Sequence, residues 1–166
     1  MKNKKIEVKW AIVFTLITLL WMMFEKSMGW HDELIAKHAL YTNWFAPLAI
    51  LIFIVALKDK RKNYFMGEMR WLDGFKSGVL ISIFVAILSP LSQYIVHEFI
   101  TPNYFENIIS FTVEKGEMTQ EQAEDYFSFK SYIFQSAIGA LVMGVITSAI
   151  VALFLKTKKT KAVDTQ

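Results

Sequence analysis

The sequence predicts an all-α, polytopic membrane protein in which four transmembrane helices form two helical hairpins. Of the 166 residues 54% are hydrophobic, and four long runs contain no charged side chain: Trp10–Phe24, Ala39–Leu57, Ser77–Val96 and Ser131–Leu155. A bilayer core of roughly 30 Å needs about 20 apolar helical residues, and four spans are too few to close a β-barrel. The runs therefore predict four membrane-spanning helices.

The spans are placed at about residues 10–29, 39–57, 76–97 and 131–155 of one membrane domain that covers residues 1–166. The first span follows several lysines, and Ser27-Met28-Gly29 has the small residues of a signal-peptide cleavage site. Glu25 and Lys26 lie inside that recognition region, so we expect the first span to be retained in the mature protein.

Basic residues are distributed unevenly between the two sides of the spans. Fourteen of the 18 lysines and arginines lie in the N-terminus, in the loop between the second and third spans, or in a basic tail at residues 156–166. The opposite side carries ten of the 15 acidic residues. Cytoplasmic loops carry the excess of lysine and arginine, so both termini and the middle loop, including Lys58–Lys62, are expected in the cytoplasm.

Residues 98–130 form the only sizeable segment outside the membrane, and they predict one or two short extracytoplasmic helices. Thr101-Pro102 is typical of a helix start and Gly116 of a helix end. Thr119–Gln122 fits a capping box for a second helix that continues into the fourth span. The first of these helices has an apolar face, which is a candidate surface for binding a partner: Tyr104, Phe105, Ile108 and Ile109.

Small residues recur at every fourth position in the last two spans. They are Gly74, Gly78, Ser82 and Ala86 in and before the third span, and Ser136, Ala140, Gly144 and Ser148 in the fourth. Small residues allow two helix backbones to approach closely in lipid. The two stripes therefore predict helix packing, either between the third and fourth spans of one molecule or between two copies in a homodimer.

Pro90 predicts a kink in the third span, because proline removes a backbone donor and clashes with the carbonyl one turn earlier. Ser89, Ser92 and Gln93 stand beside it, where they can hydrogen-bond the backbone groups that the proline frees. Pro90 and Gln93 are also a candidate polar site, because a kink beside an amide can line a ligand cavity.

The three histidines and several acids lie on the acidic side of the spans: His31, His38, His97, Glu25, Asp32, Glu33 and Glu98. Imidazole and carboxylate together suit zinc and similar ions, but the spacing matches no ligand signature. We therefore predict no metal site and no cofactor. No cysteine is present and no nucleophile motif is found, so we expect neither an enzyme nor, without a folded basic face, a protein that binds nucleic acid.

Three segments resemble a known family of bacterial membrane proteins, the domain of unknown function family 4199. They are Trp71–Gly78 at the start of the third span, Ile100–Tyr104 outside the membrane, and Gly116–Glu124 before a final span rich in glycine and serine. The resemblance covers most of the chain, and the order and spacing of the segments carry it. It implies a four-span protein of the bacterial cytoplasmic (inner) membrane, and it implies no activity.

These features favour a small structural or interaction subunit that is surrounded by the lipid bilayer. Its expected partner is a second copy of the chain or another membrane or periplasmic protein. The alternative function is a carrier or channel for a small solute that uses the kinked third span. A continuous polar path through the spans would favour transport, whereas an uncovered apolar patch on the outer helices would favour interaction.

Overall fold

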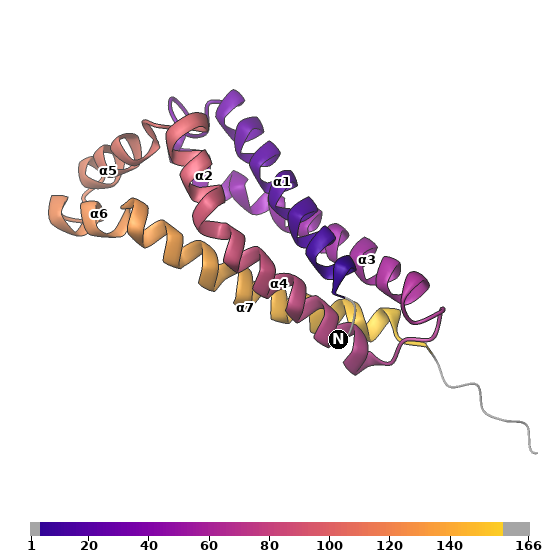
Figure 1. Cartoon of the computed structure of the whole chain (residues 1–166). Coiled ribbons are helices and arrows are strands. Elements are labelled where there is room, and N and C mark those ends of the chain that lie inside the picture. Colours follow the sequence, from indigo (N-terminus) through magenta and orange to yellow (C-terminus); the bar gives the residue numbers. More distant parts are fainter. Residues whose placement is uncertain (1–3, 158–166) are drawn as a thin grey trace, which may run out of the picture.

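The computed structural model describes residues 4–157, which form an elongated bundle of helices (Figure 1). Four long helices run along the bundle: α1 (Lys5–Ser27), α3 (Phe45–Asn63), α4 (Trp71–Ile95) and α7 (Phe129–Leu155). Shorter elements lie toward one end: α2 (Ile35–Tyr41), the 3-10 turn η1 (Thr42–Trp44), the π-helical turn η2 (Val96–Ile100), α5 (Tyr104–Glu114) and α6 (Gln120–Tyr126). The described residues contain no strand, so the predicted all-α class is confirmed.

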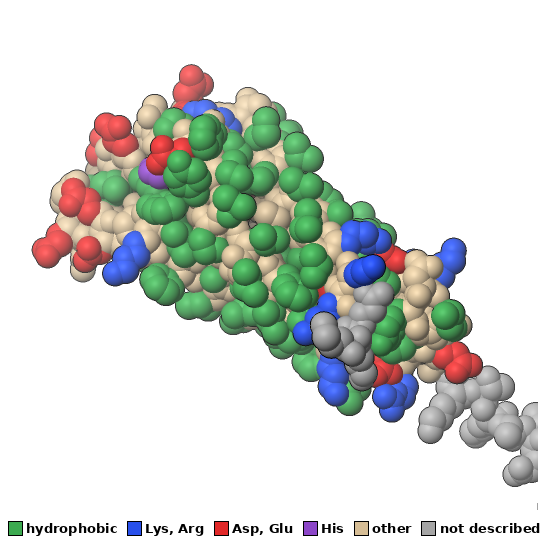
Figure 2. All heavy atoms as spheres, in the orientation of Figure 1, with side chains coloured by type: hydrophobic (Ala, Val, Ile, Leu, Met, Phe, Trp, Pro, Cys, Tyr) green, Lys and Arg blue, Asp and Glu red, His purple; other side chains and the backbone are tan. Residues whose placement is uncertain are grey.

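Four segments of the described chain are long and apolar enough to cross a membrane, as predicted. They are Lys5–Ser27, Ile35–Asn63, Trp71–Ile100 and Phe129–Leu155. Hydrophobic side chains cover the middle of the bundle, and charged side chains gather toward its two extremities (Figure 2). We call the extremity with the start of α1 and the loop between α3 and α4 the basic end, and the extremity with α2, α5 and α6 the acidic end.

The helices extend further toward the basic end than hydropathy predicts, and three of them share a buried polar contact there. Lys60 Nζ lies 2.8 Å from Glu7 Oε1, and the Ser77 hydroxyl donates to the same oxygen at 2.6 Å. All three side chains are buried. Lys60, which the sequence groups with the exposed lysines that set orientation, therefore forms an internal ion pair between α1 and α3. Most of the predicted basic tail lies outside the described residues, which end at Thr157.

α6 starts where the sequence predicts and ends earlier. Thr119 and Gln122 make both reciprocal hydrogen bonds of the capping box, which confirms this start. The helix does not continue into the fourth span. It ends at Tyr126, and α7 has its own N-cap, because the Ser128 hydroxyl accepts from the Ser131 amide at 3.2 Å.

α5 begins later than predicted, at Tyr104, and the residue before it makes no side-chain cap. Thr101 is therefore not the N-cap of this helix, and its buried hydroxyl bonds no described residue. The predicted helix end is correct: α5 stops at Glu114, and Gly116 follows in the left-handed region with a φ of +69°.

α4 and α7 cross closely through their small residues in the half of the bundle near the basic end. A Cβ atom placed on Gly78 would lie 2.6 Å from the Cβ atom of Ser148, and one placed on Gly144 would lie 2.6 Å from that of Ser82. No side chain larger than hydrogen fits either glycine position without a shift. The parts of the two stripes near the basic end thus face each other within one molecule, which is how helices reach close contact in lipid.

α4 continues through Pro90 as one helix. The proline cannot donate to the carbonyl of Ala86, and the Ser89 hydroxyl donates to that carbonyl at 2.8 Å instead. The ribbon of α4 changes direction in its last turns, before the π-helical turn η2 (Figure 1). Irregular hydrogen bonding of this kind is a recognised cause of helix bending.

Gly144→Ala is expected to destabilise the protein, because the new methyl group overlaps Ser82. Overpacking of this kind costs about 1–3 kcal/mol, more than the roughly 1 kcal/mol that alanine gains over glycine inside a helix. Gly139→Ala is the matched control on the same helix, since nothing lies within 4 Å of a Cβ atom at that position. Thermal unfolding in detergent should give a lower midpoint for Gly144→Ala only. Equal midpoints would contradict the close crossing of α4 and α7.

Candidate functional site: cavities near the acidic end

A tight loop brings three titratable side chains together near the acidic end. Glu25 lies in the last turn of α1, His31 in the following loop and His38 in α2. Gly29 permits the reversal of the chain, because its φ of +73° is readily adopted only by glycine. Its carbonyl accepts from the Leu34 amide at 2.8 Å, which closes the loop. His31 is thereby folded back onto the end of α1.

The carboxylate of Glu25 is the centre of this group. Glu25 Oε2 lies 2.9 Å from His31 Nε2 and 3.8 Å from His38 Nδ1, and Oε1 accepts a hydrogen bond from the Trp21 indole. Glu25 and His31 are almost completely buried, whereas 16% of the His38 side chain is exposed. We call Glu25, His31 and His38 the acid–imidazole cluster.

α5 covers the acid–imidazole cluster with an aromatic side chain. The Tyr104 ring centroid lies 5.2 Å from the centroid of each imidazole, and its hydroxyl lies 3.1 Å from that of Tyr132. Burial raises the pKa of the Tyr104 phenol above its ordinary value, so the phenol stays protonated. Asn107 holds α5 in place, because its amide donates to the His31 carbonyl and to the Asp32 carboxylate, both at 3.0 Å.

A cavity of about 70 Å³ lies beside the cluster, and its wall includes Gln93, Thr101 and Tyr104 as well as both cluster histidines. Three buried atoms of these residues have no hydrogen-bond partner among the described residues: His31 Nδ1, His38 Nδ1 and Thr101 Oγ1. Buried polar atoms are normally hydrogen-bonded. The cavity therefore offers polar atoms to a few water molecules or an ion, and it has the room that they need.

A larger crevice of about 430 Å³ lies between the two helical hairpins, from the middle of the spans toward the acidic end. All four spans line it, and none of the lining residues is charged. Ser136 and Ala140, in the outer half of the stripe on α7, belong to its wall. Other hydroxyls in the wall donate to carbonyls of their own helices, so their oxygens remain as acceptors: Thr15, Thr18, Ser89 and Ser92.

Gln93 lines both the cavity and the crevice. The side-chain amide of Gln93 makes no hydrogen bond to another residue in the part of the chain that the structure describes, so it is available to a ligand. Toward the basic end a pocket of about 60 Å³ follows the crevice. Beyond that pocket, the buried side chains of Leu57, Ile81 and Val151 belong to the packed core of the bundle.

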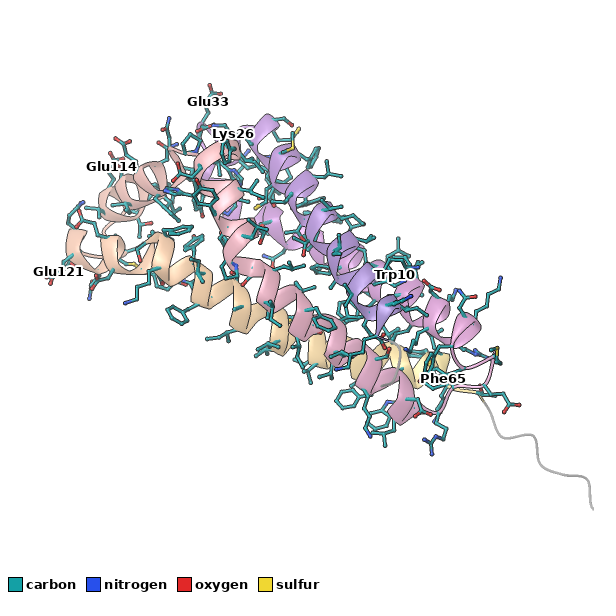
Figure 3. The ribbon with its side chains drawn as sticks, in the orientation of Figure 1. Trp10, Lys26, Glu33, Phe65, Glu114 and Glu121 are labelled. Carbon is teal, nitrogen blue, oxygen red and sulfur yellow. The ribbon has the colours of Figure 1, made fainter. Side chains whose placement is uncertain are left out.

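The candidate partner face on α5 is turned toward the protein's own bundle. Tyr104 and Ile108 are buried, and Phe105 and Ile109 are half-buried. Glu33, Glu114 and Glu121 point outward at the acidic end (Figure 3). The exposed surface of α5 and α6 is therefore largely acidic, and the apolar side chains of α5 serve mainly to dock it.

His97 lies apart from the acid–imidazole cluster. Its Nε2 atom is 3.9 Å from Glu98 Oε1, and its ring stacks on Phe129 with the centroids 5.5 Å apart. The sequence places all three histidines on one side of the spans, but it does not select the pair that meets Glu25. The signal that could have done so is an acid in the last turn of a span, followed by a glycine turn and a histidine.

These features define a multi-pass membrane protein with four spans. One half of its bundle contains an uncharged crevice and a smaller cavity lined by histidines. The chain belongs to the family described as "Protein of unknown function (DUF4199)", whose family model matches residues 9–157. The resemblance seen in the sequence is thereby confirmed. No curated protein and no solved structure matches the chain.

Asn107→Ala is expected to loosen α5, because it removes two hydrogen bonds to the loop that carries His31. Hydrogen bonds contribute about 0.5–1.5 kcal/mol each, so amide hydrogen exchange in residues 104–114 should accelerate roughly tenfold. Glu106→Ala, at an exposed position on the same helix, should leave the exchange unchanged. If the two variants exchange at the same rate, Asn107 does not hold the helix on the bundle.

Proposed function

We propose that the protein is a carrier that binds a small uncharged solute in the crevice between its two hairpins. The observation that carries the proposal is a crevice of about 430 Å³ among the spans whose wall has no charged residue. Ligand pockets usually measure about 300–1,000 Å³ and combine apolar walls with a few polar groups. A charged solute would lose its hydration there without meeting an opposite charge.

The hydrogen bonds of the crevice wall indicate the chemistry of the solute. The hydroxyl donors of Thr15, Thr18, Ser89 and Ser92 are used within their own helices. Their oxygens can still accept, so the wall favours a solute that donates hydrogen bonds, such as a polyol or an amide. Gln93, beside the kink at Pro90, supplies a group that both donates and accepts.

A carrier fits this geometry better than an open channel does. The crevice ends against packed side chains in the half of the bundle near the basic end, where Gly144 meets Ser82. Release on the other side would require the two hairpins to close near the acidic end and to separate near the basic end. The proposal involves binding and movement of a solute without a chemical reaction.

We further propose that the basic end faces the cytoplasm of a bacterial cell. The excess of lysine and arginine at that end supports this orientation in the cytoplasmic (inner) membrane. Trp10 lies at the same end (Figure 3), where its indole donates to Asp59 at 2.7 Å. The crevice and the acid–imidazole cluster would then lie in the half of the membrane nearest the cell exterior.

The rival function is the structural or interaction subunit favoured by the sequence. Its support is the exposed surface of α5 and α6, which carries Glu114, Glu121 and Tyr126, with 48% of Tyr126 accessible. A periplasmic or membrane protein with a basic surface would be a suitable partner for this acidic surface. In this role the crevice would hold lipid. Whether water or lipid fills the crevice therefore distinguishes the two functions.

The crevice should be accessible to water, and the absence of native cysteine makes this measurable. Ser136→Cys places a thiol in the crevice wall. Ile138→Cys places a thiol at a similar depth on α7, at a position where the native side chain is 59% exposed. A water-soluble thiosulfonate should modify the first at least tenfold faster, because thiols react as thiolates in water.

Uncharged polyols or amides should slow the modification of the thiol at position 136 by occupying the crevice. Gln93→Ala should weaken this protection of the thiol. Equal and slow modification at positions 136 and 138 would mean that lipid fills the crevice. The carrier would then be excluded in favour of the interaction subunit.

The orientation should be visible from outside intact cells. Lys62→Cys and Ser110→Cys carry thiols at exposed positions near opposite ends of the bundle. An impermeant thiol reagent is expected to label only Ser110→Cys in cells and both variants after permeabilisation. Labelling of Lys62→Cys in intact cells would reverse the proposed orientation.

A further inference from the structure

An ionised Glu25 needs a compensating charge that the lysines and arginines in the described part of the chain do not provide. Glu25 is fully buried, and its oxygens meet Trp21, His31 and His38 but no lysine or arginine among the described residues. The adjacent Lys26 pairs with Asp32. A buried carboxylate is costly unless an opposite charge accompanies it. A bound cation at this place would supply that charge.

The geometry of the acid–imidazole cluster suits a bound cation. One ligand atom from each of Glu25, His31 and His38 can be chosen so that all three lie within 4.8 Å of one another. Bonds of about 2.0–2.1 Å to zinc place neighbouring ligand atoms of a tetrahedron about 3.3 Å apart. The distances from Glu25 Oε2 to His31 and His38, 2.9 and 3.8 Å, lie on either side of that value.

Two further observations point to a ligand at this place. His38 Nδ1, the imidazole nitrogen of His38 that lies nearest Glu25, is buried without a hydrogen-bond partner among the described residues, although an unsatisfied buried nitrogen is destabilising. The adjoining cavity of about 70 Å³ has room for a water molecule in an open coordination position. Thr101, whose hydroxyl also lacks a described partner, lines this cavity and would hydrogen-bond that water.

We propose that Glu25, His31 and His38 bind one divalent transition-metal ion of the zinc class, with a water molecule from the cavity as a further ligand. Imidazole ligands select such ions over magnesium and calcium, which prefer oxygen. The metal joins the end of α1 to α2 beneath the Tyr104 ring. This replaces the expectation of no metal that the sequence supports, and it is independent of solute binding in the crevice.

The metal site is tested on the full-length protein, purified in detergent with a tag that contains no histidine and stripped with a chelator. Titration with zinc should show one saturable equivalent per chain, and zinc should raise the midpoint of thermal unfolding. Cobalt should give the absorption bands of a tetrahedral nitrogen–oxygen site. Lowering the pH should release the metal, because protons compete for the imidazoles.

Variants show whether the three named residues hold the ion. Glu25→Gln and His38→Gln should each weaken zinc binding at least tenfold, whereas His97→Gln, a histidine of the same cavity outside the cluster, should retain it. His38 is partly exposed, so His38→Gln decides the matter if Glu25→Gln fails to fold. The proposal is overturned if the native protein binds no zinc, if His38→Gln binds it normally, or if His97→Gln loses it equally. Absence of zinc binding would leave a histidine–glutamate ion pair as the compensating arrangement.

Discussion

The close crossing of α4 and α7 is the constraint on which the rest of the bundle depends. Lipid gives little hydrophobic reason for two apolar helices to pair, so pairing relies on backbones that come near each other. Gly78 against Ser148 and Gly144 against Ser82 provide this approach near the basic end only. The outer half of the α7 stripe, with Ser136 and Ala140, lines a crevice instead. One pattern of small residues thus builds both an interface and the wall of a cavity.

Two buried acids on α1 are compensated in different ways. Glu7 meets Lys60 and Ser77 through Oε1, so a lysine compensates its charge at the basic end. Glu25 meets imidazoles and an indole, and only a proton or a metal can complete that arrangement. Ionisable groups near membrane spans are usually retained for function. The acid that meets no lysine is therefore the more informative of the two.

Much of the fold could be predicted because bilayer thickness fixes the length of an apolar helix. Hydrogen bonds between residues close in the sequence could also be predicted, as the capping box at Thr119 illustrates. The partner of Lys60 was not predictable, since Glu7 comes from a distant part of the chain. The pairing of His31 and His38 depends on a loop whose path no periodicity specifies. The crevice is harder still to predict from the sequence. It forms where side chains of different helices do not pack against each other, and a sequence shows only which side chains are present.

The position of the acid–imidazole cluster also has a consequence for biosynthesis. Glu25, His31 and His38 belong to the first hairpin, and so do Glu7 and its partner Lys60. Both buried acids of α1 can therefore meet these neighbours before the second hairpin has left the ribosome. Ser77 lies in α4, so its hydrogen bond to Glu7 forms only when the second hairpin arrives. The first hairpin can thus enter the lipid with the charge of Glu7 already paired.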